Sequence, residues 1–203
     1  MIPFTQTARK ANENSRLQEL YIRGETDFGP TTAHSNTMTA PTQMRTSRLV
    51  CDRFTMEHVD ALAVMDRDAE VQQWLFGKTY TAEETKERAQ RRVSSWDEHG
   101  AGDYIVHTNE GEFIGFAGFF PSPRPDAIAI GYALVPEHWG HGYGTELALL
   151  LTDTARSLGR AEIVATVRDT NTASRRILEK AGFTPIGRGE TEAETLLYRL
   201  QTL

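Results

Sequence analysis

The sequence has a single cysteine and no long apolar run. Cys51 stands alone among 203 residues, so an internal disulfide is impossible and a reducing compartment is expected. No segment approaches the ~18 consecutive apolar residues that a membrane span requires. The first ten residues, MIPFTQTARK, lack the apolar core of a signal peptide. We therefore expect a cytoplasmic protein that does not enter a membrane.

Positive charge is also in short supply. The chain has 22 Lys and Arg residues against 28 Asp and Glu residues, which gives a formal net charge of −6. Nucleic-acid-binding proteins are usually basic overall, so we expect no nucleic-acid partner. The 39% of hydrophobic and 25% of charged residues are ordinary for a globular protein. We expect a monomer or a homodimer.

The first 43 residues are poor in aliphatic side chains and rich in Thr, Asn, Ser and Gln. This composition predicts a mobile N-terminal extension over residues 1–43, with one short helix at 14–23, ahead of a folded domain over 44–203. A start of the native chain at Met38 or Met44 is an alternative.

The most informative stretch, residues 128–159, reads as a strand, a glycine-rich turn and a helix. The strand alternates between bulky residues, Ile128, Ile130, Tyr132 and Leu134, and small residues, Ala127, Ala129, Gly131 and Ala133. The turn is Trp139-Gly140-His141-Gly142-Tyr143-Gly144, and Thr145 opens the predicted helix.

Glycines at a helix entrance leave backbone N–H groups pointing outward, and the helix dipole adds positive potential there. The turn therefore predicts a site for a phosphate-bearing ligand, although a tight turn that needs glycine only for its shape is the alternative. A Walker loop is excluded because no lysine lies nearby. A dinucleotide fingerprint would need glycine where Thr145 stands.

The run GYALVPEHWGHGYGTEL resembles the acetyl-coenzyme A site of the GNAT superfamily of N-acetyltransferases, and a second family segment follows at residues 171–183. Trp139, where most members carry Gln or Arg, is shared with the ribosomal-protein N-terminal branch (the RimJ/RimL type). The resemblance implies an α/β fold with a mixed, mostly antiparallel sheet and helices on both faces. It also implies a V-shaped opening between the fourth and fifth strands, and acetyl-CoA as co-substrate.

The resemblance also suggests site residues. The coenzyme would be held by backbone groups of the strand end, by the turn and by the second segment, at Leu134, Val135, Gly140, His141, Gly142, Tyr143, Gly144, Thr145, Asn171 and Ser174. Asn171 also satisfies the pattern of a helix N-cap. The amine acceptor would be lined by Trp74, Phe76 and Tyr132, for which a role in the core is the alternative.

The catalytic acid and base are not identifiable from the sequence. Leu178 stands where many members carry a tyrosine that protonates the leaving thiolate, and Ala129 stands where many carry a glutamate. His138 and His141 flank the turn but have no further metal ligands nearby, so we expect no metal. We expect an N-acetyltransferase acting on a protein or peptide N-terminal α-amine. A small-molecule amine acetyltransferase and a non-catalytic acyl-CoA-binding or sensing domain are the alternatives.

The remaining patterns predict a strand–helix order along the domain. Strands are expected at residues 48–54, 103–107, 112–120, 162–167, 183–186 and 195–200, and helices at 55–66, 81–96 and 172–181.

Overall fold

The computed structural model describes residues 39–122, 127–189 and 194–202. The helix expected at 14–23 and the rest of residues 1–38 lie outside these ranges. The strands are β1 (Gln43–Arg45), β2 (Leu49–Arg53), β3 (Asp103–Thr108), β4 (Phe113–Pro121), β5 (Ala127–Leu134), β6 (Glu162–Arg168), β7 (Thr184–Arg188) and β8 (Thr195–Gln201). The helices are η1 (Met56–His58), α2 (Val59–Arg67), α3 (Ala69–Gln72), α4 (Ala82–His99), η2 (Pro136–His138), α5 (Tyr143–Ser157) and α6 (Thr172–Lys180).

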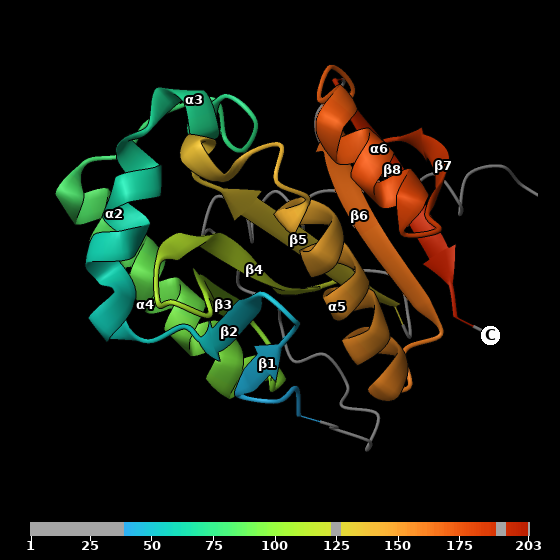
Figure 1. Cartoon of the computed structure of the whole chain (residues 1–203), viewed down its shortest axis with the longest axis horizontal. Coiled ribbons are helices and arrows are strands. Elements are labelled where there is room, and N and C mark those ends of the chain that lie inside the picture. Colours follow the sequence, from blue (N-terminus) through green and yellow to red (C-terminus); the bar gives the residue numbers. More distant parts are fainter. Residues whose placement is uncertain (1–38, 123–126, 190–193, 203) are drawn as a thin grey trace, which may run out of the picture.

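The strands form one sheet in the order β1-β2-β3-β4-β5-β6-β8-β7 (Figure 1). Every neighbouring pair is antiparallel except β5 and β6, which run parallel. The mixed, mostly antiparallel sheet is therefore confirmed. The single parallel pair is joined by α5, as parallel strands need a crossover connection.

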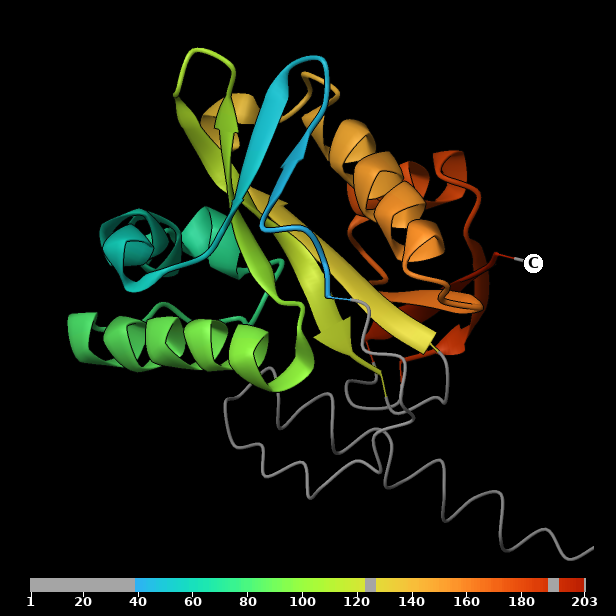
Figure 2. The same cartoon turned by 90° about the horizontal axis from the view of Figure 1, so that it is seen from below.

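Helices cover both faces of the sheet, as expected (Figure 2). One buried cluster lies between the sheet and α2, α3 and α4. It contains Phe54, Leu62, Met65, Val71, Ala89, Ile105 and Phe116. On the other face, Leu147, Leu151 and Ala155 of α5 and Leu178 of α6 pack on Ile128, Ile130 and Ile163 of the sheet. The period-2 pattern of β5 thus places its bulky residues under α5.

Residues 39–43, which the sequence assigned to the extension, pack against the domain. Ala40 is buried, and its N–H donates to the carbonyl of Gly100 at 2.8 Å. The Tyr104 hydroxyl donates to the carbonyl of Pro41 at 2.7 Å, and β1 adds a strand that the sequence did not predict. Short edge strands with polar faces carry little hydrophobic signal, which explains the miss.

Most other element predictions are confirmed, with shifts at the ends. Thr81 and Glu84 form the expected capping box of α4, since each backbone N–H donates to the other's side chain. The helix expected at 55–66 begins with the short η1 turn, and α5 begins at Tyr143 instead of Thr145. Among the residues that the structure describes, no helix is long and apolar enough to cross a membrane.

Candidate functional site

The sheet opens between β5 and β6. These strands pair only where Ala127–Ala129 meet Glu162–Val164, and they then diverge towards their carboxyl ends (Figure 1). These are the fourth and fifth strands that the sequence predicted, because β1 was not among them. The opening therefore lies where the resemblance placed it.

Backbone alternation shows which groups of β5 face this opening. The N–H of Val135 donates to the carbonyl of Ile114 on β4 at 3.0 Å, so the backbone groups of Val135 and Ala133 point towards β4. Those of Tyr132 and Leu134 point the other way, where no strand in the described ranges pairs with them.

Of the two strand-end candidates, Leu134 has a backbone N–H without an acceptor in the described ranges, and Val135 does not. The carbonyl of Val135 accepts from the N–H of His138 at 3.1 Å, so both of its backbone groups are engaged. The carbonyl of Leu134 accepts from the indole N–H of Trp139 at 2.8 Å, which leaves its N–H. Trp139 thus has a structural role that the sequence did not reveal: it ties the turn to the end of β5.

The glycine turn presents a row of amides. Gly140 and Gly142 have φ of +78° and +83°, in the left-handed region that favours glycine. The first bond that closes α5 runs from the N–H of Glu146 to the carbonyl of Gly142 at 3.2 Å. Within the described part of the chain, the N–H groups of residues 140–145 have no acceptor. Such a row of amides, together with the helix dipole, is an arrangement that can bind an anion.

Gly144 serves a different purpose, the close approach of two helices. A Cβ at this position would lie 2.8 Å from Cδ1 of Ile177 on α6 and 3.5 Å from Cε2 of Tyr132. The first turn of α5 therefore packs directly against α6 and β5. This contact sets the row of amides at the mouth of the opening.

Asn171, Ser174 and Tyr132 meet across the opening. Asn171 Oδ1 accepts from the N–H of Ser174 at 3.0 Å, which confirms the N-cap of α6. The hydroxyls of Ser174 and Tyr132 lie 3.2 Å apart. Burial raises the pKa of Tyr132 to about 12, with the bond to Ser174 acting in the opposite sense. The phenol is therefore protonated at neutral pH and can donate a hydrogen bond. Tyr132 was predicted at the acceptor. In the structure it contacts Ser174, one of the two coenzyme candidates at the start of α6.

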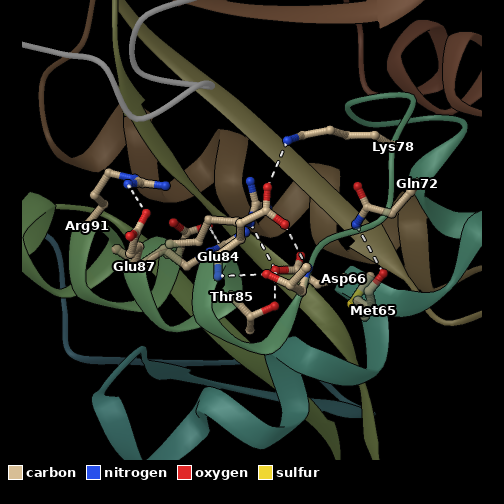
Figure 3. Close-up of polar contacts among 12 residues, drawn as sticks. Met65, Asp66, Gln72, Lys78, Glu84, Thr85, Glu87 and Arg91 are labelled. Atoms are coloured by element: carbon tan, nitrogen blue, oxygen red, sulfur yellow. Dashed lines mark hydrogen bonds and ion pairs between the residues drawn. The ribbon is translucent and has the colours of Figure 1, made fainter.

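Phe76, the second acceptor candidate, packs against α4. The Arg88 guanidinium lies 4.5 Å from the ring centroid of Phe76 and 4.1 Å from that of Tyr80. Arg88 is in turn paired with the buried Asp66 at 3.0 Å, and the Thr85 hydroxyl donates to the same carboxylate oxygen (Figure 3). The loop that follows α3 is thus fastened to α4. Phe76 itself is half-buried, so this contact does not exclude the predicted place at the acceptor.

The same loop also reaches β6. Arg168 Nη2, at the end of β6, donates to the carbonyl of Leu75 at 3.4 Å. Trp74, the remaining acceptor candidate, is half-buried in this loop. The structure therefore brings the loop to the carboxyl end of β6, at the open side of the V. Neither Arg88 nor Arg168 stood out in the sequence, because their partners are distant in the chain.

The two positions that depart from the family pattern are buried. Ala129 is 3% exposed and Leu178 is 1% exposed, and both belong to the core. On the small-residue face of β5, the Phe120 ring lies within 2.9 Å of where a Gly131 Cβ would stand, so that face is covered there. His138 lies 3.5 Å from Glu112, and His141 packs by the Tyr143 ring. No group of three or more potential metal ligands occurs in residues 39–122, 127–189 and 194–202.

The divided sheet and the row of amides define the class of protein: an α/β acyltransferase domain. The acetyltransferase (GNAT) domain model matches residues 48–184. The chain belongs to the GNAT family of acetyltransferases, whose co-substrate is acetyl-CoA. The resemblance seen in the sequence is therefore confirmed for the family, the fold and the class of enzyme.

Two relatives from Bacillus subtilis (strain 168) are similar to the chain. The uncharacterized N-acetyltransferase YoaA is 38% identical over 74 residues, which is 36% of this chain and 42% of that protein. The uncharacterized protein YkkB is 29% identical over 155 residues, 67% of this chain and 84% of that protein. The chain thus spans less than half the length of the first relative and most of the second.

Solved structures share the fold. A GNAT-family acetyltransferase from Bacillus anthracis superposes with a TM-score of 0.68 at 20% identity, over 79% of this chain and 98% of that one. RimL, a ribosomal L7/L12 alpha-N-protein acetyltransferase in complex with coenzyme A, gives 0.66 at 23% identity, over 80% and 97%. At these identities the likeness concerns the fold alone.

Proposed function

We propose that this chain transfers an acetyl group from acetyl-CoA to the N-terminal α-amine of a protein or peptide, as RimJ/RimL-type enzymes do. The observation that carries the proposal is the opening between β5 and β6, with amides that lack acceptors among the described residues at one edge and two facing hydroxyls inside it. The amides of residues 140–145 bind the coenzyme diphosphate. The free Leu134 N–H and Asn171 hold the pantetheine arm and the thioester.

The reaction forms a C–N bond and breaks the C–S bond of the thioester. The N–H of Leu134 stabilises charge on the carbonyl oxygen as the amine attacks. The departing thiolate accepts hydrogen bonds from the facing hydroxyls of Ser174 and Tyr132, which lie 3.2 Å apart, and is protonated from the solvent that receives the proton of the amine. Because burial raises the pKa of Tyr132 to about 12, the phenol keeps its proton and stabilises the thiolate as a hydrogen-bond donor.

The acceptor class follows from the absence of a carboxylate at Ala129. An α-amine has a reference pKa of about 7.7–8.0 and a lysine side chain one of about 10.4. The gap of about 2.5 units corresponds to roughly 3.4 kcal/mol more to deprotonate lysine at a given pH. With a buried methyl group at position 129, the amine loses its proton to solvent, which favours the α-amine.

The test compares two peptides at pH 7. One has a free N-terminus and no lysine, and the other is N-terminally blocked and carries one lysine. Coenzyme A release should be faster with the free N-terminus, and its rate should rise with pH and level off near the pKa of that amine. Faster reaction of the blocked lysine peptide would refute the α-amine as acceptor. A small-molecule amine that outpaces both peptides would favour that alternative, and binding of acetyl-CoA without any transfer would favour a sensing domain.

A further inference from the structure

Arg48, at the tip of the hairpin formed by β1 and β2, reaches the glycine turn. Its Nη1 donates to the carbonyl of His141 at 3.0 Å, and its Nε donates to Glu146 Oε2 at 2.7 Å. The guanidinium carbon lies 4.5 Å from the centroid of the Tyr143 ring. One side chain thus contacts the turn, the first residue of α5 and the first turn of that helix.

The bond to His141 fixes the direction of a peptide group in the turn. In a trans peptide the carbonyl and the following N–H point in opposite directions. Because the His141 carbonyl points to Arg48, the N–H of Gly142 points away from it, on the side where the amides of residues 140–145 lack acceptors. Glycine at 142 would otherwise allow this peptide to rotate.

Glu146 places a negative charge behind the same amides. Its side chain is 16% exposed, and it accepts from the Thr46 hydroxyl and from Arg48. Burial by itself would raise the pKa of Glu146, but the hydrogen bonds from Thr46 and Arg48 and the charge of Arg48 outweigh it and lower the pKa. The carboxylate is ionised at neutral pH. It suits the helix dipole but would repel a diphosphate unless Arg48 neutralised it.

The hairpin tip that carries Arg48 is itself held in place. The N–H of Asn109 donates to the carbonyl of Arg48 at 3.0 Å, and the Asn109 side chain donates to the carbonyl of Ser47 at 2.7 Å. The tip of the hairpin formed by β3 and β4 therefore braces the tip that contacts α5. Because the backbone of Arg48 is already fixed, its side chain loses less conformational entropy when the guanidinium binds the turn.

We infer that Arg48 is a positioning residue for the coenzyme diphosphate, which orients the amides of the turn and cancels the charge of Glu146. This inference rests on the proposed coenzyme site but not on the identity of the acceptor. It predicts opposite effects for the two partners of the ion pair: removing Arg48 exposes the diphosphate to Glu146, whereas neutralising Glu146 does not.

The experiment measures binding of coenzyme A by calorimetry, and of pantetheine, which lacks the diphosphate, by ligand-observed NMR. Arg48→Ala should raise the Kd for coenzyme A by about tenfold or more, since it removes charge-assisted hydrogen bonds behind the site. It should leave pantetheine binding unchanged. The double variant R48A/E146Q should recover part of the lost affinity, and R48K should retain more affinity than R48A because it keeps the charge. Arg45→Ala, on the exposed β1, is the matched control and should bind like wild type.

Three results would overturn the inference. The first is an unchanged Kd for coenzyme A in R48A, and the second is a loss of pantetheine affinity in R48A as large as the loss of coenzyme A affinity. The third is a double variant that binds coenzyme A no more tightly than R48A. The proposed function fails separately, because no acceptor enters this experiment. If the variants show the whole binding pattern but the protein transfers no acetyl group, the role inferred for Arg48 stands and the proposed reaction is wrong.

Discussion

Gly140 offers the most direct test of the amide row. Its φ of +78° is accessible to Asn and Asp as well as to Gly, and a Cβ added there would meet no heavy atom within 4 Å. Gly142 and Gly144 are less suitable positions. A side chain at 142 would start 3.6 Å from Arg48 Nη2, so a new carboxylate would be neutralised, and one at 144 would collide with Ile177.

Gly140→Asp places a carboxylate beside the proposed diphosphate. Two unit charges about 5 Å apart, at an effective dielectric constant of roughly 20, repel each other by about 3 kcal/mol. This energy corresponds to a loss of coenzyme A affinity of more than about a hundredfold. Gly140→Asn has nearly the same size and the same tolerance of positive φ but carries no charge. The affinity of this variant for coenzyme A should therefore fall only a few-fold.

The assay is titration calorimetry with coenzyme A for wild type, G140D and G140N, with the melting temperature of each recorded. We expect all three proteins to melt within about two degrees of one another, because the position is exposed and unobstructed. If G140D binds coenzyme A within threefold of G140N, the diphosphate does not lie on this turn and the site assignment is wrong.

Three further outcomes are expected. Asn171→Ala should weaken coenzyme A binding in calorimetry and lower the free energy of unfolding by about 1 kcal/mol, whereas Asn171→Asp should keep the cap; wild-type affinity in both would reduce Asn171 to a cap. A chain that lacks residues 39–43 should melt several degrees below one that begins at Thr39, since it loses buried hydrogen bonds to the domain; equal melting temperatures would contradict that contact. Arg88→Met should cost about 3–5 kcal/mol in denaturant unfolding because Asp66 is left buried and unpaired, and adding Asp66→Leu should restore much of it; a loss below 1 kcal/mol would show that the pair is not a structural anchor.

Local features of the site could be read directly from the sequence. The alternation in β5, the glycines that permit a positive φ and the Asn171 cap each depend on residues a few positions apart, so their signals are present in a short window. The boundary of α5 shifted by only two residues, to Tyr143, because a helix end is set by weak local preferences.

Assignments that depend on distant partners could not be read from the sequence. Phe76 was predicted at the acceptor, and the structure adds a contact with Arg88 of the next helix that the sequence does not indicate. Val135 looked equivalent to Leu134, yet strand alternation commits it to β4 and leaves Leu134 facing the opening.

The sequence by itself determined which residues form the strand, the turn and the helix, and through its motifs it determined the family. Only the tertiary structure decided where the parallel pairing of β5 and β6 stops, and hence where the sheet opens. It also joined Arg48 to Glu146 across 98 positions of the chain. The physical reason is that hydrogen-bond patterns within an element follow from local chemistry, whereas register and ion pairs between elements follow from how the whole core packs.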